Sequence, residues 1–301
     1  MRPASLWRRP ARGRFAPFPA RRLADSMKRP ARTLLAVYDW TVFYLCLAEF
    51  VLLSLAWSVL ATLLHLVLPR KLGQRVGRTG IMLSCRLFLA TLTLSGRFHF
   101  DLCQLDALRD EKAMIIAPNH PSLWDAVMMA SRLPDAAIIM KSTILNNVLL
   151  GGGARLSRYI PNDSVRSMIC LALDNLRSGS HVLLFPEGTR TVTPPIGRIT
   201  GAVGVIACRA RLPVQAVLVE TNSRFLSKGW PAWRKPDLPL HYTVRLGRRF
   251  DVPTNSAAFV GELQQYFSDA LNEIQPAAVP DVVVMASTAP LPVSQLTPNA
   301  K

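Results

Sequence analysis

A histidine and a carboxylate lie five positions apart in the segment Asn119-His120-Pro-Ser-Leu-Trp-Asp125. A carboxylate that reaches one imidazole nitrogen fixes the tautomer of the ring and leaves the second nitrogen to take a proton from an alcohol. His120 and Asp125 are therefore the candidate catalytic pair, with His120 as general base. The alternative is a helix capping box, in which Ser122 caps a helix and Asp125 reaches back from its first turn.

A second motif, Phe185-Pro-Glu187-Gly188-Thr189-Arg190, follows an apolar run about sixty residues later. Arginine is the side chain best shaped to bind phosphate through two parallel hydrogen bonds. The alternative is a turn that ends a strand, with Arg190 as a surface charge. Together the two motifs indicate a base that activates a hydroxyl and a cation that holds the molecule carrying it.

In this order and at this distance, the two motifs resemble those of the glycerolipid acyltransferase family, whose best-known members acylate 1-acylglycerol-3-phosphate to phosphatidic acid. The resemblance covers about residues 97–250, and the family has four sequence blocks. The block from His120 to Asp125 and the block from Phe185 to Arg190 match it without exception.

The other two blocks depart from the family pattern. The second contains Lys141-Ser142 but reads Tyr159-Ile-Pro-Asn-Asp163 where the family has an Ile-Asp-Arg-like triplet. Arg158 or Arg166 is a candidate to replace that arginine. The fourth block, Leu212-Pro-Val-Gln-Ala-Val217, lacks the second proline of the family. The resemblance therefore specifies the reaction more firmly than the acceptor.

The resemblance implies an O-acyltransferase that uses acyl-CoA or acyl carrier protein as co-substrate, with no cofactor and no metal. It places Glu187 and Gly188 in the acceptor site and Arg190 on the phosphate of the acceptor, with Thr189 either a ligand or a turn residue. Lys141 and Arg158 are further candidates for the phosphate. Backbone N–H groups near Gly188, or the Asn119 amide, are candidates to stabilise the developing oxyanion.

Three rival hypotheses stay open. The acceptor is 1-acylglycerol-3-phosphate, or it is a different lysolipid or a polyene-linked headgroup. A membrane-tethered lipid-binding protein without catalysis would use the same basic cleft. An acyl-cysteine enzyme would use Cys170 or Cys208, although neither has a histidine at a recognisable spacing. The five cysteines form no metal-binding pattern.

Charge is concentrated at the amino end of the chain. Residues 1–32 carry ten Lys and Arg against one Asp, which is +9 of the total formal charge of +17. So basic a segment, with few large apolar residues, is expected to be disordered. No nucleic-acid motif accompanies the charge, so membrane lipids are favoured over nucleic acid as partner. Met27 is interpreted as the natural start of the protein; the alternative is that residues 1–26, which are rich in Arg and poor in acidic residues, are an organellar transit peptide.

A long apolar stretch follows, from Thr41 to Leu68, interrupted by Glu49 and His65. As one helix it would measure about 42 Å, which exceeds the roughly 30 Å hydrocarbon core of a bilayer. Basic residues flank both ends, and a second apolar stretch, Ile81–Leu94, is short for a span. We expect two helices that enter one leaflet on the cytosolic face, of a bacterial inner membrane; a buried helical pair is the alternative.

Short apolar runs alternate with helical patterns between residues 98 and 274, which predicts an α/β fold with a mixed, largely parallel sheet flanked by helices. Loops at the carboxyl ends of neighbouring strands converge in such folds, which would bring His120 and Arg190 together. Gly151–Gly153 is expected to be a flexible loop. The predicted organisation is a basic tail (1–32), membrane-associated helices (33–95), a catalytic domain (96–275) and a disordered tail (276–301).

Overall fold

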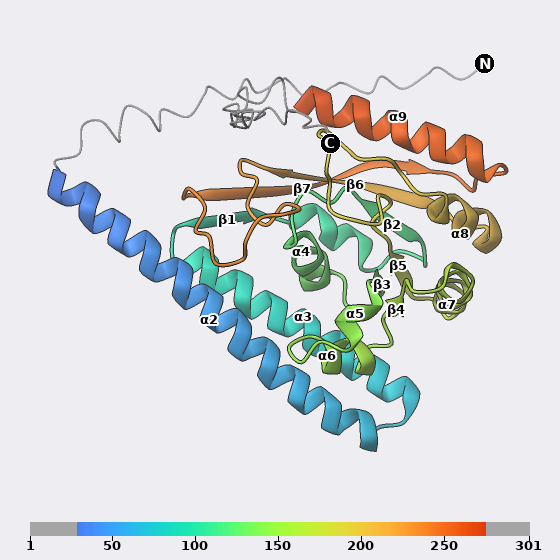
Figure 1. Ribbon diagram of the computed structural model, residues 1–301. Coiled ribbons are helices and arrows are strands. Elements are labelled where there is room, and N and C mark those ends of the chain that lie inside the picture. The colour runs from blue at the N-terminus through green and yellow to red at the C-terminus, as the bar shows by residue number, and fades with distance from the viewer. Residues whose placement is uncertain (1–28, 275–301) are drawn as a thin grey trace, which may run out of the picture.

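The computed structural model describes residues 29–274, with helices on both faces of one central sheet (Figure 1). The tails expected at residues 1–28 and 275–301, and Met27 with them, lie outside the described residues. The helices are α2 (Arg29–Val67), α3 (Arg70–Leu94), the 3-10 helix η1 (Cys103–Leu108), α4 (Asp125–Arg132), α5 (Ser142–Leu145), α6 (Gly151–Leu156), α7 (Val165–Arg177), α8 (Ala202–Ala210) and α9 (Ser256–Ile274).

Seven strands form the sheet, in the order β1-β7-β6-β2-β5-β3-β4. They are β1 (Phe98–Asp101), β2 (Ile115–Pro118), β3 (Ala136–Met140), β4 (Ile160–Pro161), β5 (His181–Leu183), β6 (Val214–Thr221) and β7 (Leu240–Phe250). Neighbouring strands are parallel, except that β6 and β7 are antiparallel. The predicted mixed, largely parallel α/β sheet is confirmed.

The central strands are buried on both faces, which explains their nearly continuous apolar sequences. On one face, a core cluster joins the sheet to α2, α3 and α4 and includes Phe88, Trp124 and Phe225. On the other face, α7, α8 and α9 contribute to a second cluster, which includes Phe259 and Phe267. The register Ile116↔Leu183 between β2 and β5 sets the two motifs side by side, because each motif begins just after one of these strands.

Helices α2 and α3 form a hairpin beneath the sheet, on the side of α4 (Figure 1). Residues 31–67 of α2 are the one segment among the described residues that is long and apolar enough to cross a membrane, and only 11% of its most apolar window is buried. A core helix of a soluble domain would be mostly buried, so the alternative of a buried helical pair does not fit α2.

Two expectations for local structure are wrong. Gly151–Gly153 begins helix α6 instead of forming a flexible loop. The glycines allow close approach: a Cβ on Gly152 would lie 2.0 Å from the carbonyl oxygen of Ser58 on α2. Helix α2 also begins at Arg29, within the segment assigned to the basic tail. Pro30 is compatible with this start because a first-turn residue needs no N–H partner.

Candidate active site

His120 and Asp125 meet as the sequence predicts. The imidazole Nδ1 lies 2.9 Å from Asp125 Oδ2. Asp125 is fully buried, and burial raises the pKa of its carboxyl while the hydrogen bond with His120 lowers it. An ionised Asp125 accepts from Nδ1–H, which makes Nε2 the basic nitrogen. Nε2 has no hydrogen-bond partner within residues 29–274, so the pair can take a proton from a bound hydroxyl.

The predicted capping box is wrong, because Trp124 and not Ser122 is the N-cap of α4 and no side chain among residues 29–274 caps the helix. The expected contact between Asp125 and Ser122 is nevertheless present. Asp125 Oδ2 accepts a hydrogen bond from the backbone N–H of Ser122 at 2.8 Å as well as from His120. The Ser122 hydroxyl is buried and donates to the carbonyl of Phe225 at 3.0 Å. Helix α4 begins at Asp125 itself. The loop before α4 therefore holds the Asp125 carboxylate in place beside His120.

Glu187 connects the second motif to the first. One oxygen of its buried carboxylate accepts from the backbone N–H of His120 at 3.1 Å and from the hydroxyl of Thr191 at 2.8 Å. The other accepts from the backbone N–H of Gly197 at 2.8 Å. The carbonyl of His120 in turn accepts from Thr191 N–H at 2.7 Å. Both Glu187 oxygens thus accept hydrogen bonds within the protein and hold the His120 loop, while its expected place on the acceptor stays a prediction.

Arg190 lies beside this loop. Its Nη1 donates to the carbonyls of Leu226 at 2.8 Å and Ser227 at 3.0 Å. These bonds direct the guanidinium without neutralising it, and no carboxylate pairs with Arg190 in the described part of the chain. Arg190 therefore keeps a positive charge next to His120.

The two oxyanion candidates are engaged elsewhere. The buried side-chain amide of Asn119 donates to Val219 O at 3.0 Å and accepts from Val219 N–H at 2.7 Å. It extends the ladder between β2 and β6 by one more pair, and so positions His120. Gly188 has a positive φ of 68°, and its N–H donates to the carbonyl of Phe185 at 2.9 Å. Both amides therefore make hydrogen bonds within the fold.

The remaining expected residues differ in position. Lys141 is exposed and follows β3, so it stands at the same sheet edge as His120, two strands away or roughly 10 Å. Arg158 precedes β4 and lies below that edge, so the fold does not bring it to the site. Arg166 is exposed in the first turn of α7, directly after β4, and is the better placed replacement. Thr189 is a half-buried turn residue.

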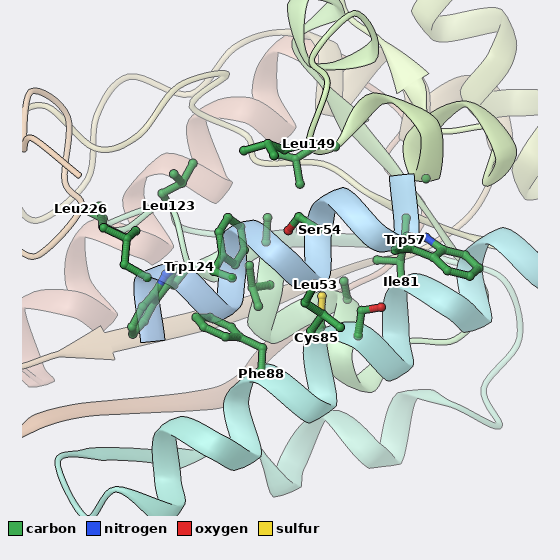
Figure 2. A pocket seen from close by; sticks show the side chains of 18 of the residues that line it. Leu53, Ser54, Trp57, Ile81, Cys85, Phe88, Leu123, Trp124, Leu149 and Leu226 are labelled. Carbon is green, nitrogen blue, oxygen red and sulfur yellow. The ribbon is translucent and has the colours of Figure 1, made fainter. Parts of the chain in front are cut away.

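A large apolar cavity begins beside the two motifs. Its volume is about 290 Å³, and it lies between the α2–α3 hairpin and helices α4 to α6. Figure 2 shows Leu123, Trp124 and Leu226 at one end and Trp57 and Ile81 at the other. Leu123 and Trp124 closely follow His120, while Leu226 accepts the hydrogen bond from Arg190. The site therefore combines a base and a cation with an apolar chamber.

Sequence reasoning missed three contributors. Phe185 stacks on the His120 ring, with ring centroids 3.9 Å apart. Thr191 follows the recognised motif and bonds both His120 and Glu187. Tyr242, on β7, places its hydroxyl 3.4 Å from Ser122 Oγ. Of the three, only Phe185 could have been recognised from the sequence, since it belongs to the second motif.

Cys170 and Cys208 lie on α7 and α8, on the opposite sheet face from the cavity.

The site agrees with known proteins. The family model described as Acyltransferase matches residues 99–220. A 1-acyl-sn-glycerol-3-phosphate acyltransferase of Pseudomonas aeruginosa is 23% identical over 78% of this chain and 91% of its own length. A putative 1-acyl-sn-glycerol-3-phosphate acyltransferase of Caenorhabditis elegans, acl-1, is 21% identical over 43% of this chain and 52% of its own length.

The fold has a solved counterpart. The crystal structure of the 1-acyl-sn-glycerophosphate acyltransferase PlsC from Thermotoga maritima superposes with a TM-score of 0.59, at 16% identity. It covers 84% of this chain and 100% of that one. The segment that matches the Acyltransferase family model, residues 99–220, contains both the His120–Asp125 pair and the Phe185–Arg190 motif.

Proposed function

We propose that this enzyme transfers a fatty acyl group from a thioester, acyl-CoA or acyl carrier protein, to the free hydroxyl of a lysolipid. The observation that carries the proposal is the His120–Asp125 pair, which leaves Nε2 without a partner among residues 29–274, three residues before the first cavity-lining residue of its loop. Leu123 and Trp124 join the two, because they line the cavity within four residues of the base.

In the proposed reaction, His120 Nε2 takes the proton of the acceptor hydroxyl as the hydroxyl oxygen attacks the thioester carbonyl carbon. An oxygen–carbon bond forms, and the carbon–sulfur bond then breaks. The imidazolium, stabilised by Asp125, returns the proton to the departing thiolate. No acyl-enzyme is needed, since the thioester is already activated. The cavity takes the acyl chain, because its lining is almost wholly apolar.

We further propose 1-acylglycerol-3-phosphate as the acceptor. Arg190 offers a positive charge beside His120 without a carboxylate partner among residues 29–274, and guanidinium suits phosphate. Both curated relatives carry names of enzymes for this acceptor. The missing arginine after Ile160 leaves a different lysolipid as the second candidate. The exposed apolar surface of α2 favours action at a membrane, which we place at its cytosolic face.

A competition assay tests the acceptor. The purified full chain receives one labelled acyl thioester and equal concentrations of 1-acylglycerol-3-phosphate, a zwitterionic lysophospholipid and an uncharged monoacylglycerol. We expect phosphatidic acid as the main product. Preferential acylation of either other acceptor would contradict the assignment, while absence of transfer to all three would count against acyl transfer itself.

Arg190→Ala tests the phosphate contact. We expect KM for the phosphate-bearing acceptor to rise at least tenfold, because a charge-assisted hydrogen bond contributes about 1.5–3 kcal/mol. The thioester KM should change little. Arg209→Ala, at an exposed position on α8, is the matched control. An unchanged acceptor KM in Arg190→Ala would remove Arg190 from the acceptor site.

A further inference from the structure

Four exposed apolar side chains project from three loops around the cavity. They are Leu123 after β2, Val148 and Leu150 between α5 and α6, and Trp233 between β6 and β7; we call them the rim. Val148 is 75% exposed and Trp233 is 71% exposed. Each of these loops also lines the cavity, through Leu123, Leu149, Leu150 and Ala232. The rim residues therefore lie on the loops that line the cavity, and none of them belongs to the α2–α3 hairpin.

The loop that carries Trp233 is fixed to α2. Phe225 packs edge-on against Phe43, with ring centroids 6.0 Å apart. Lys235 Nζ lies 5.5 Å from the ring centroid of Trp40, which is itself exposed. In Figure 1 the loop between β6 and β7 lies beside the upper half of α2. Any surface that covers the apolar side of α2 there also reaches the loop.

The positive charge of this loop favours a bilayer with anionic lipids as the surface that covers the rim. Residues 222–239 contain four Lys and Arg against one Asp. Arg234 lies 4.7 Å from the ring centroid of Trp230, which places a cation beside an aromatic ring. Tryptophan beside Lys or Arg is typical of the headgroup level of a bilayer, and basic residues near the surface favour anionic lipids by about 1 kcal/mol each. A second copy of so basic a surface would be repelled.

We propose that the rim is a second membrane contact, in which Val148 and Trp233 enter a bilayer with anionic headgroups while Lys228, Arg234 and Lys235 lie at its surface. The cavity then opens directly toward the lipid, so an acyl chain reaches it without crossing water. The proposal concerns position and not chemistry. It can fail while acyl transfer stands, and it can hold even if His120 has no catalytic role.

Site-directed spin labelling tests it with a matched pair of valines. Exposed Cys103 and Cys170 are replaced by Ser, and a nitroxide is attached to Val148→Cys, Trp233→Cys or Val165→Cys. Val165 is 65% exposed at the start of α7, on the other sheet face, and is the control for Val148. The parent without an introduced cysteine gives the background from Cys46, Cys85 and Cys208. The full chain is placed in vesicles of phosphatidylcholine with phosphatidylglycerol.

We expect the labels at 148 and 233 to be several-fold more accessible to oxygen than to a water-soluble nickel chelate, and the label at 165 to show the reverse. The access of the nickel chelate to the label at 233 should rise in vesicles of phosphatidylcholine alone. It should also rise in the triple variant Lys228→Gln, Arg234→Gln, Lys235→Gln. Equal nickel access at 148, 233 and 165 would overturn the proposal. Dipolar broadening between labelled molecules would overturn it too, in favour of a second copy. If the labels are equally inaccessible to nickel with and without anionic lipid, the proposed role of the three basic residues is overturned.

Discussion

At the residue scale, one oxygen of Asp125 bonds both the backbone before α4 and the imidazole of His120. Oδ2 accepts from the Ser122 N–H at the start of α4 and from Nδ1 of His120. The other oxygen is buried and has no hydrogen-bond partner within residues 29–274. A buried acceptor without a partner costs free energy. The arrangement therefore gives a carboxylate whose geometry is fixed by the backbone before any substrate binds.

Asp125→Asn is expected to lower kcat by about 10²–10⁴-fold, the usual contribution of a positioned base, while the protein stays folded. An Asn oxygen at the position of Oδ2 keeps both hydrogen bonds but carries no negative charge to stabilise the imidazolium, whereas an NH₂ at that position would face Nδ1. That contact favours the tautomer with the proton on Nε2, which cannot act as base. Steady-state kinetics with circular dichroism provide the measurement.

Asp174→Asn is the matched control, because Asp174 lies exposed on α7 in an ion pair with an exposed arginine. It should leave kcat unchanged. Near-normal activity in Asp125→Asn would reduce Asp125 to a residue that only holds the loop before α4.

The pairing of His120 with Asp125 could be predicted from spacing, because a short loop before a helix leaves few ways to place the two side chains. The role of Glu187 could not be predicted. Its three donors are the N–H groups of His120 and Gly197 and the hydroxyl of Thr191. Two of these donors are backbone N–H groups, which almost every residue type supplies, so the residue types give no indication that they bind Glu187. Similarly, nothing local to Asn119 indicates its pairing with Val219, a hundred residues away.

At the scale of elements, helix α6 is fitted against α2 by glycine. The Gly152 N–H donates to Ser58 Oγ at 3.1 Å, and the carbonyl of Ser58 fills the space of a Cβ. A Cβ on Gly80 of α3 would lie 2.0 Å from the ring of Trp57, the neighbour of Ser58, and a Cβ on Gly153 would lie 2.8 Å from it. This contact sets one end of the cavity, because both Trp57 and Gly153 line it.

Gly152→Ala is expected to destabilise the protein by about 1–3 kcal/mol, because the new Cβ would overlap backbone and α2 must move away. Gly261→Ala is the control, since a Cβ at that helical position of α9 meets nothing within 4 Å and should be neutral or stabilising. Thermal unfolding in detergent measures both. Equal midpoints for the two variants would mean that α2 is not held by α6.

The same contact explains why one element was wrongly predicted. Three consecutive glycines indicate a flexible loop when only local propensity is considered. Tertiary packing reverses that preference here, since only glycine allows the α2 backbone to approach so closely. By contrast, β3 (Ala136–Met140) and α9 (Ser256–Ile274) lie within the predicted alternation of strands and helices between residues 98 and 274. Both have regular apolar patterns, which depend on burial of one face or both and not on a particular partner.

At the scale of the whole molecule, α2 presents apolar surface outward while its polar residues turn inward. Glu49 accepts from Thr91 Oγ1 of α3 at 2.6 Å, and Asp39 forms an ion pair with Arg97 at 2.6 Å. The Glu49 carboxylate, which interrupts the apolar stretch, is thus bonded within the hairpin. Intramembrane acids with partners of this kind are tolerated. The single-leaflet arrangement, with both ends cytosolic, stays a prediction that reporter fusions at the two termini would test.

Global stability should fall in acid, in part through His181. This residue is buried at the start of β5, and burial lowers the pKa of its imidazole. Its Nε2 lies 3.0 Å from the carbonyl of Leu108, and Nδ1 has no partner in the described chain. The unfolded chain binds more protons than the folded one, so the contribution of His181 is complete above its unfolded pKa of about 6.5 and declines below it.

We expect the unfolding midpoint of the wild type to drop between pH 7.5 and pH 5, and the drop to be smaller in His181→Gln. Other groups titrate equally in both proteins, so the difference between them isolates this imidazole. Identical pH dependence in the two proteins would show that His181 is not held neutral by the fold.

The most direct test of the central claim is the rate of acyl transfer by His120→Ala. The purified full-length variant is assayed with a labelled acyl thioester and 1-acylglycerol-3-phosphate, beside His241→Ala, whose imidazole is exposed on β7. We predict that His120→Ala lowers kcat by about 10²–10⁴-fold with an unchanged unfolding midpoint, and that His241→Ala retains wild-type turnover. Full activity in a folded His120→Ala protein would contradict the account.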